Sequence, residues 1–349
     1  MKKSKVYIKE GKQLKESIAE LFQNLGITDI KGKKVFVKPN MLRPAKPAEG
    51  VVTHPQLIFE TVSFLLDKGA NVLVGDNSLP NRTCNQFDIA KECGFVDVSH
   101  GQFRNIGRYP KKIKRQKKLL KEVYVSREIL DCDILVSLPK FKTHNLTTMS
   151  VAIKNHFGII PGGLKAYIHS LFPKIKDFSK VLLEIYRLRP PDIIIVDCLN
   201  IVDAKGKRFT PGKIIAGDNG HAIDYTCALM AGINPYLIPT LKIARDNGFF
   251  DPTKIEFIGE IEQLKDYSVP FRFPLRNPVA ESIAWILYRI WLSRVPVIDH
   301  SICSGCLSCE NVCPKRAIKK QKIDYKKCIK CYCCMEVCPT RAITTKFKI

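Results

Sequence analysis

Short apolar runs alternate with segments of helical periodicity along the first 275 residues of the chain. The apolar runs predict strands at 6–8, 35–37, 72–74, 134–136, 193–196 and 214–216. Apolar residues at helical spacing predict helices at 14–25, 55–68 and 221–230. Strands that are apolar throughout are typically buried on both faces, and their alternation with helices favours parallel pairing. We therefore expect an α/β fold, with a mostly parallel sheet and helices on both faces.

Polar residues directly follow most of the predicted strands. They are Lys38, Asn40, Asp76, Lys140, Lys142, His144, Asp197 and Asp218. In open α/β sheets, ligands bind outside the carboxyl ends of the strands, so one site can gather these groups. The alternative for each residue is a local role, because Asp and Asn are common in turns and at helix N-termini. Taken together, we expect these residues to form a site.

The segment 138–158 has the densest set of candidate functional residues. Asn145 or Thr147 can cap a helix that ends near Gly158. The basic stretch 140–144 would then lie at the N-terminus of this helix. Free N–H groups and the helix dipole favour an anion at that position. The segment therefore predicts an anion-binding helix terminus.

We divide the candidates by expected role. The substrate-binding candidates are Lys38, Asn40, Asp76, Lys140 and Lys142, with Lys140 and Lys142 binding the anion. The catalytic candidates are His144, Lys154 and Asn155. Neighbouring lysines favour a neutral imidazole at His144, which suits proton transfer or substrate orientation. Lys154 and Asn155 would contact polar groups of the substrate. The alternative for His144 is a structural role beside the helix cap.

Eight cysteines near the end of the chain form two runs of identical spacing. The runs are Cys303-x2-Cys306-x2-Cys309-x3-Cys313-Pro314 and Cys328-x2-Cys331-x2-Cys334-x3-Cys338-Pro339. Matching positions are 25 residues apart, and Ile298-Asp299 recurs as Ile323-Asp324, which indicates a duplicated unit. The spacing resembles that of bacterial two-cluster ferredoxins, in which eight thiolates hold two [4Fe–4S] clusters. We therefore expect two [4Fe–4S] clusters as cofactors.

The resemblance also implies which cysteines share a cluster, because the fourth Cys of each run ligates the other cluster. One cluster would be held by Cys303, Cys306, Cys309 and Cys338, and the other by Cys328, Cys331, Cys334 and Cys313. A disulfide framework is an alternative, but it requires an oxidising compartment. A pair of zinc sites would leave the third Cys and the Cys-Pro ending of each run unexplained. The additional Cys333 breaks the spacing and is expected to be a packed or spare thiol.

Three short elements upstream of the cysteines resemble a known family. They are Lys38-Pro39-Asn40, Pro139-Lys140-Phe141-Lys142-Thr143-His144 and Lys154-Asn155-His156-Phe157-Gly158. The uncharacterised family called domain of unknown function 362 has elements of the forms Lys-Pro-Asn, Pro-Lys-x-Lys-Thr-His and Lys-Asn-x-x-Gly. The resemblance covers roughly residues 1–260, and fusion to a two-cluster ferredoxin is similar to known members. The family implies no established reaction.

Charge adds one further candidate surface. The chain has 57 Lys and Arg against 33 Asp and Glu, a formal net charge of +24, which can indicate nucleic-acid binding. Most of these charges are dispersed, but residues 108–121 contain eight Lys or Arg in fourteen positions. This stretch can be a solvated loop, a docking surface for an acidic redox partner or a nucleic-acid surface. It lacks the interleaved aromatic residues that stack on bases, so a nucleic-acid partner is not expected.

The remaining patterns divide the chain into three parts. We expect an α/β domain at 1–275, a linker and connecting helix at 276–296, and a two-cluster ferredoxin domain at 297–349. The helix at 279–295 would pack the ferredoxin onto the large domain or, alternatively, lie on a membrane surface. We predict no membrane span and no signal peptide. Fourteen cysteines without a secretion signal favour the cytoplasm.

These patterns together predict an iron–sulfur redox protein. Electrons would pass between the ferredoxin domain and a small anionic substrate or a partner at the α/β domain. We expect a redox partner protein. The alternatives are a non-enzymatic electron carrier or assembly factor, and a redox-gated nucleic-acid binder that uses residues 108–121.

Overall fold

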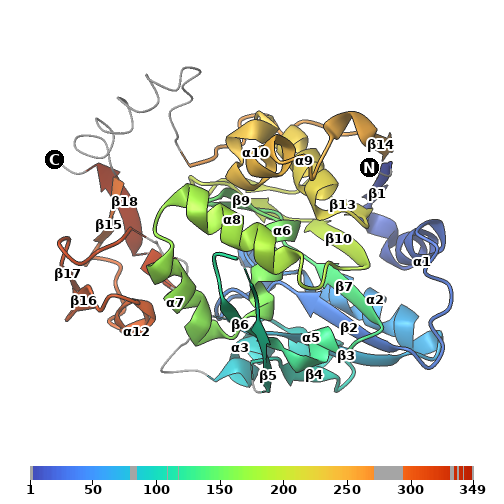
Figure 1. The fold of residues 1–349 in the computed structure, drawn as a ribbon, viewed down its shortest axis with the longest axis horizontal. Coiled ribbons are helices and arrows are strands. Elements are labelled where there is room, and N and C mark those ends of the chain that lie inside the picture. Colours follow the sequence, from blue (N-terminus) through green and yellow to red (C-terminus); the bar gives the residue numbers. More distant parts are fainter. Residues whose placement is uncertain are drawn as a thin grey trace.

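The large domain is built on one eight-stranded sheet (Figure 1). The computed structural model describes residues 3–78, 85–107, 109–116, 118–270, 294–330, 334–335, 338–340 and 342–347. The sheet order is β14 (Ile255–Ile258), β1 (Ser4–Glu10), β13 (Lys213–Gly217), β10 (Ile193–Cys198), β7 (Ile134–Leu138), β2 (Lys34–Pro39), β3 (Asn71–Asp76) and β4 (Phe103–Asn105). The predicted apolar runs all lie in strands of this sheet.

Strand direction determines which residues share an edge of the sheet. The strands β10, β7, β2, β3 and β4 are parallel neighbours, whereas β13 is antiparallel to both β10 and β1. The prediction of a mostly parallel sheet is therefore confirmed. Asp218 follows the reversed strand β13, so it lies at the opposite edge from Asp76 and Asp197, and its inclusion in the predicted site was wrong.

Helices cover both faces of the sheet, as predicted. One face packs against α1 (Leu14–Asn24), α2 (Pro55–Asp67), α3 (Gln86–Glu92) and α4 (Phe95–Val98). The other face packs against α6 (Ala152–His156), α8 (Ile175–Tyr186), α9 (Gly220–Met230) and α10 (Pro239–Asp246). Successive residues of one strand point to opposite faces, so that Phe36 joins the second core and Val35 and Val37 join the first.

Smaller elements complete the large domain. The remaining helices are α5 (Arg127–Leu130), α7 (Gly162–Leu171), and the short 3-10 helices η1 (Gly11–Gln13), η2 (Pro47–Glu49), η3 (Phe157–Ile159), η4 (Pro235–Leu237) and η5 (Pro252–Lys254). Three hairpins pair β5 (Pro110–Lys114) with β6 (Glu122–Ser126), β8 (Lys142–His144) with β9 (Thr148–Ser150), and β11 (Ile201–Val202) with β12 (Arg208–Phe209). The basic stretch 108–121 thus lies largely on the β5–β6 hairpin, although residues 108 and 117 lie outside the described residues.

The β8–β9 hairpin replaces the first part of the predicted helix at 145–158, so that prediction was wrong. His144 faces Thr148 across the hairpin, and the His144 Nδ1 accepts the backbone N–H groups of Leu146 and Thr147 at 3.1 Å each. The imidazole of His144 therefore stabilises a hairpin turn at residues 145–147, where the sequence predicted a helix N-cap. Helix α6 begins only at Ala152.

The N-terminus of α6 is also not available to an anion in the predicted way. The carboxylate of Asp224 on α9 accepts the N–H of Ala152 at 2.7 Å. Burial raises the pKa of Asp224 to about 7, although hydrogen bonds from Ala152 and Ile153 act in the opposite direction. The carboxyl group of Asp224 thus occupies this helix terminus, where the free N–H groups favour its charged form against the effect of burial.

The cysteine-rich module consists of β15 (Arg294–Ile298), β16 (Ile318–Lys319), β17 (Lys322–Ile323), β18 (Ile343–Phe347) and α12 (Ser308–Val312). The outer strands pair β15 with β18, and the inner hairpin pairs β16 with β17. Arg294 and Val295 therefore belong to a strand and not to the predicted connecting helix. The rest of that helix, and most of the predicted linker at 276–296, lie outside the described residues.

Two buried histidines lie between α6, α8 and α9. The His221 ring stacks on Phe250 and meets the edge of Tyr186, whose other neighbour is His156. Burial lowers the pKa of His156 to about 3 and that of His221 to about 4. Below a pH of about 6.5, the unfolded chain therefore binds protons that the folded protein excludes. Stability contributed by these groups is present at neutral pH and is lost as the pH falls.

We expect the variant His221→Phe to be less sensitive to acid than the wild type. The phenyl ring can take the same aromatic contacts, but it cannot bind a proton. Between pH 7 and pH 5, its free energy of unfolding should fall by about 2 kcal/mol less than that of the wild type. Urea denaturation at several pH values measures this difference. Equal pH dependence in the two proteins would contradict a buried neutral His221.

The chain passes unusually close to the ends of β2 and β3 at Gly158. A Cβ atom at this position would lie 2.5 Å from the Lys38 Nζ and 2.8 Å from the Asp76 Oδ1. Both side chains are buried and paired with each other. The missing side chain at Gly158 therefore allows η3 to pack over this ion pair.

We expect Gly158→Ala to destabilise the large domain by about 1–3 kcal/mol, since overpacking displaces the buried ion pair. Gly163→Ala is the matched control, because a Cβ atom added at this position of α7 would meet no atom within 4 Å beyond its chain neighbours and the backbone of its own helix. The control should be neutral or slightly stabilising. Urea midpoints of the two variants test the contrast, and equal midpoints would disprove the close packing at Gly158.

Candidate functional site

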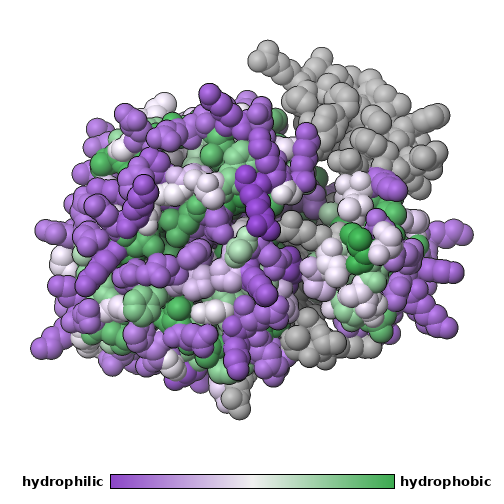
Figure 2. All heavy atoms as spheres, turned by 180° about the vertical axis from the view of Figure 1, so that it is seen from behind, coloured by the Kyte–Doolittle hydropathy of each residue, from purple (hydrophilic) through white to green (hydrophobic). Residues whose placement is uncertain are grey.

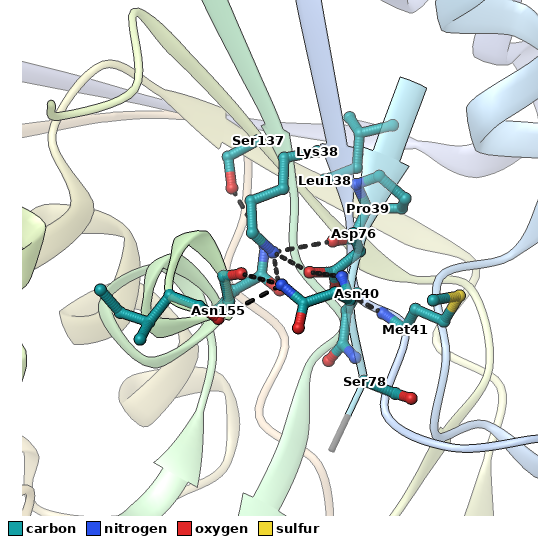
Figure 3. A network of polar contacts seen from close by, with 12 residues as sticks. Lys38, Pro39, Asn40, Met41, Asp76, Ser78, Ser137, Leu138 and Asn155 are labelled. Atoms are coloured by element: carbon teal, nitrogen blue, oxygen red, sulfur yellow. Dashed lines mark hydrogen bonds and ion pairs between the residues drawn. The ribbon is translucent and has the colours of Figure 1, made fainter. Parts of the chain in front are cut away.

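The carboxyl ends of β2 and β3, together with helix α6, place three predicted site residues in one network (Figure 3). The Lys38 Nζ lies 3.0 Å from the Asp76 Oδ1 and 3.4 Å from the Asn155 Oδ1. The Asn155 Nδ2 donates to the Ser137 Oγ at 3.2 Å. The structure thus brings together Lys38, Asp76 and Asn155, which are separated by up to 117 residues in the chain.

In this network, the charge of Asp76 balances the charge of Lys38 inside the protein. Lys38 is fully buried, and burial lowers its pKa, whereas the charge of Asp76 acts in the opposite direction. The two oxygens of Asp76 also accept the backbone N–H groups of Met41 at 2.8 Å and Asn77 at 2.9 Å. A buried ion pair is tolerated only when its remaining hydrogen-bonding capacity is satisfied, and these contacts meet that condition.

A second buried ion pair lies at the ends of β7 and β10. The Lys140 Nζ donates to the Asp197 Oδ2 and to the Asn200 Oδ1, both at 2.8 Å. Asp197 also accepts the backbone N–H of His54 at 2.6 Å. Lys140 and Asp197 are both fully buried. Lys140 is thus paired within the protein, so its predicted role in anion binding requires this pair to open.

Two other candidates, Asn40 after β2 and Lys142 on β8, take separate positions. The backbone N–H of Asn40 donates to the Thr53 Oγ1 at 2.8 Å, which joins β2 to the loop before α2. The Lys142 Nζ donates to the carbonyl of Val51 at 3.1 Å, and the Lys142 side chain is largely buried. These contacts show local anchoring, and the substrate-binding roles of Asn40 and Lys142 stay predictions.

Two further lysines lie beside the first network. The Lys154 Nζ lies over the Phe157 ring, 4.9 Å from its centroid, and the charge of Lys154 contributes to the lowered pKa of Lys38, after burial itself. Lys165 on α7 is buried and donates to the carbonyl of Asn77. Sequence reasoning missed Lys165, because a lysine on an amphipathic helix is normally solvent-exposed.

The β8–β9 hairpin connects this edge of the sheet to the cysteine-rich module. At its tip, the Asn145 Nδ2 donates to the Met335 Sδ at 3.8 Å. Met335 directly follows Cys334, and Asn145 directly follows His144. The hairpin that contains His144 therefore contacts the second cysteine repeat.

Four cysteines of the module line one cavity. Cys303, Cys306 and Cys309 come from the first repeat, and Cys338 comes from the second. These four cysteines, set among apolar residues such as Ile298 and Ile343, are the set that the spacing assigns to one [4Fe–4S] cluster. The sulfur of Cys313 accepts the backbone N–H of Ala317 at 3.2 Å, the type of hydrogen bond that tunes cluster potentials.

Not all predicted ligands can be placed. Cys328 and Cys334 lie within the described residues, and Cys334 is buried. Cys331 and the additional Cys333 lie outside the described residues. Within the described part of the chain, we find no helix whose length and apolar character would allow it to cross a bilayer.

Comparison with known proteins bears on both parts of the chain. The family model "4Fe-4S binding domain" matches residues 296–319 and 322–344. The C-terminal module is therefore a 4Fe–4S binding domain, and the protein is an iron–sulfur protein. A curated relative is the thylakoid-associated protein sll1697 of Synechocystis sp., with 26% identity over 236 residues. That match covers 64% of this chain and 71% of the relative.

Two solved structures show a weak overall likeness. The lactate racemase apoprotein of Thermoanaerobacterium thermosaccharolyticum has 15% identity and a TM-score of 0.44, over 67% of this chain and 58% of that chain. A structural-genomics protein of Thermotoga maritima has 16% identity and a TM-score of 0.44, over 64% of this chain and 59% of that chain. The chain thus spans under three fifths of the length of either structure.

The family model "Domain of unknown function (DUF362)" matches residues 35–229. This match includes the Lys38, Lys140 and Lys154 elements that form the two buried networks. Since it covers more than half of the chain, the protein belongs to the DUF362 family.

Proposed function

We propose that the protein holds two [4Fe–4S] clusters and exchanges electrons with an anionic substrate or partner at the carboxyl edge of the large sheet. The observation that carries this proposal is the contact between Asn145 and Met335. It joins the hairpin that contains His144 to the residue that follows the predicted ligand Cys334. An electron route between the module and the sheet edge would pass through this contact.

The ligand sets of the two clusters cross between the repeats in this proposal. The cavity lined by Cys303, Cys306, Cys309 and Cys338 supports the first set, because it combines three cysteines of one repeat with one of the other. By the same duplication, Cys313 would join Cys328, Cys331 and Cys334. When bound, such clusters take up and release single electrons at potentials that depend on charge and hydrogen bonds to sulfur.

Of the two roles expected for His144, substrate orientation fits its geometry beside the Asn145 contact. Its Nδ1 accepts two backbone N–H groups, so the proton of the neutral ring resides on Nε2. An Nε2–H group can donate a hydrogen bond to a substrate oxygen and stabilise the negative charge that would build up there when an electron arrives. The fixed Nδ1 contacts hold the ring in one orientation while it does so.

An excess of positive charge supports an anionic ligand at this edge. The lysines are Lys38, Lys140, Lys142, Lys154 and Lys165, whereas the carboxylates paired with them are Asp76 and Asp197. A surplus of cations in a poorly solvated edge creates a positive potential that attracts anions. Lys154 is the partly exposed member of this set, so we assign it the first contact with the ligand.

Both buried lysines are already paired with carboxylates of the protein, and this observation favours a second candidate function. Lys38 and Lys140 are fully buried and paired with carboxylates. In a non-enzymatic electron carrier or assembly factor, these pairs would be purely structural, and the large domain would only dock a partner. A small anionic ligand bound to the purified protein, identified by mass spectrometry, would favour the first function over this one.

We expect His144→Ala and Lys154→Ala each to lower electron transfer to an anionic acceptor by a factor of about 100, typical for loss of a hydrogen-bond donor to developing charge or of a charged substrate contact. Acceptors would be found by screening carboxylates and phosphate esters with the reduced protein. Lys242→Ala is the control, because Lys242 is exposed on α10. Iron content should be unchanged in all three variants. Undiminished transfer in the first two would disprove the site.

Crossed ligation predicts a specific non-additivity among cysteine variants. Cys306→Ser and Cys338→Ser should each remove the same cluster, so the double variant should lose no more iron than either single one. Cys306→Ser with Cys334→Ser should remove both clusters, about eight iron atoms in all. Iron analysis and electron paramagnetic resonance of anaerobically purified protein measure this. If the double variant Cys338→Ser, Cys334→Ser loses no more iron than either single variant, each repeat binds its own cluster and crossed ligation is wrong.

A further inference from the structure

The outer side of the cysteine-rich module has an unusual concentration of positive charge. Residues 294–349 contain twelve Lys or Arg and only four Asp or Glu. Five of the cations are exposed and form no ion pair with a described residue: Lys315, Arg316, Lys319, Lys320 and Lys322. The β16–β17 hairpin, which contains three of them, lies on the side of the module away from the large sheet (Figure 1). Figure 2 shows hydrophilic side chains along this outer edge.

The local geometry of this hairpin does not favour its own stability. Lys319 and Lys322 face each other across the strands, where like charges repel. The two turn residues, Lys320 and Gln321, have φ values of 46° and 60°. Asn and Gly are preferred in such a turn, because other side chains are strained at positive φ. The charges at this tip therefore do not serve the stability of the hairpin, which is consistent with a role in binding.

The hairpin also borders the cavity of the first cysteine set. Gln321 lines the cavity together with Cys303, Cys306, Cys309 and Cys338. The backbone N–H of Gln321 donates to the Glu310 Oε1 at 2.9 Å, which holds the hairpin tip against α12. Lys320 and Lys322 are the sequence neighbours of Gln321, so the cationic tip is fixed at the rim of this cavity.

The two cysteine sets therefore face different surroundings. The second repeat contacts the large domain through Met335, whereas the rim of the first set is cationic and exposed to solvent. We propose that the β16–β17 hairpin is the docking surface for an acidic one-electron carrier protein, which exchanges electrons through the cluster held by the first set. This inference rests on the proposed function, because it gives the electrons of that function a point of entry or exit.

The chemistry of the docked step is a single electron transfer. One electron would leave the reduced carrier and be taken up by the cluster that Cys303, Cys306, Cys309 and Cys338 would hold, with no bond made or broken. Charge complementarity favours an acidic partner, because clustered surface cations steer oppositely charged proteins and fix their orientation. The cationic rim then places the partner next to the cysteines of the first set.

An acidic flavodoxin is a suitable probe for this surface. Calorimetric titration of the full-length, iron-loaded protein with flavodoxin should show binding at low salt that weakens steeply as sodium chloride is added. The triple variant Lys319→Gln, Lys320→Gln, Lys322→Gln should bind about tenfold more weakly, with a reduced salt dependence. In stopped-flow experiments at low protein concentration, the rate at which flavodoxin hydroquinone reduces the clusters should fall by about the same factor as the affinity.

A matched control changes an equal number of lysines on the other basic hairpin. Lys111, Lys112 and Lys114 are exposed on β5, and their replacement by Gln should change binding by about twofold or less. Equal loss in this control would overturn the proposal and place the carrier on the β5–β6 hairpin. Binding of duplex DNA that displaces flavodoxin and depends on Lys319, Lys320 and Lys322 would also overturn it, in favour of a nucleic-acid partner.

Lys320→Gly provides a test if the triple variant loses iron. It removes one charge and relieves the positive φ, so it favours the folded turn. Flavodoxin affinity should still fall about two- to threefold, and unchanged affinity would overturn the proposal. His144→Ala should bind flavodoxin normally. A result that overturns the docking surface on the hairpin is therefore distinguishable from one that overturns the proposed function at the sheet edge.

Discussion

The ion pair between Lys38 and Asp76 is the interaction on which the arrangement of the large domain depends. It lies out of reach of solvent, so neither charge can be left without its partner, and every free lone pair must be satisfied. This requirement accounts for the amide of Asn155 beside the ammonium group and for the backbone N–H groups directed at the carboxylate. It also accounts for the absence of a side chain at Gly158. Family elements far apart in sequence are thus parts of one electrostatic unit.

Such a unit serves equally well as an active centre or as a structural clamp. A buried, desolvated lysine has a lowered pKa and releases its proton more easily than an exposed one. An ion pair that closes a sheet edge also fixes the relative position of two strands and a helix. The contact of the neighbouring hairpin with the iron–sulfur module favours the first interpretation, because a purely structural clamp does not require that contact.

The features that could be predicted from the sequence depend on local repetition. Apolar runs locate the strands of a buried sheet, and ligand spacing identifies the iron–sulfur module without reference to the rest of the chain. The reversed direction of β13 could not be predicted, because an apolar run has the same composition in either orientation. The β8–β9 hairpin was missed because its turn is held by the ring of His144, a contact that no propensity describes. Asp224 and Lys165 act across long sequence distances, so their partners are visible only in the fold.

The pairing of β15 with β18 has a consequence for the way the two parts of the chain are joined. Arg294 lies opposite Phe347 in this ladder, so the polypeptide enters and leaves the iron–sulfur module at adjacent points. A unit with neighbouring ends behaves as a cassette: it can be joined to another gene product at one place without disturbing its own architecture. The connection to the DUF362 domain therefore imposes little strain on the strands that frame the cysteines.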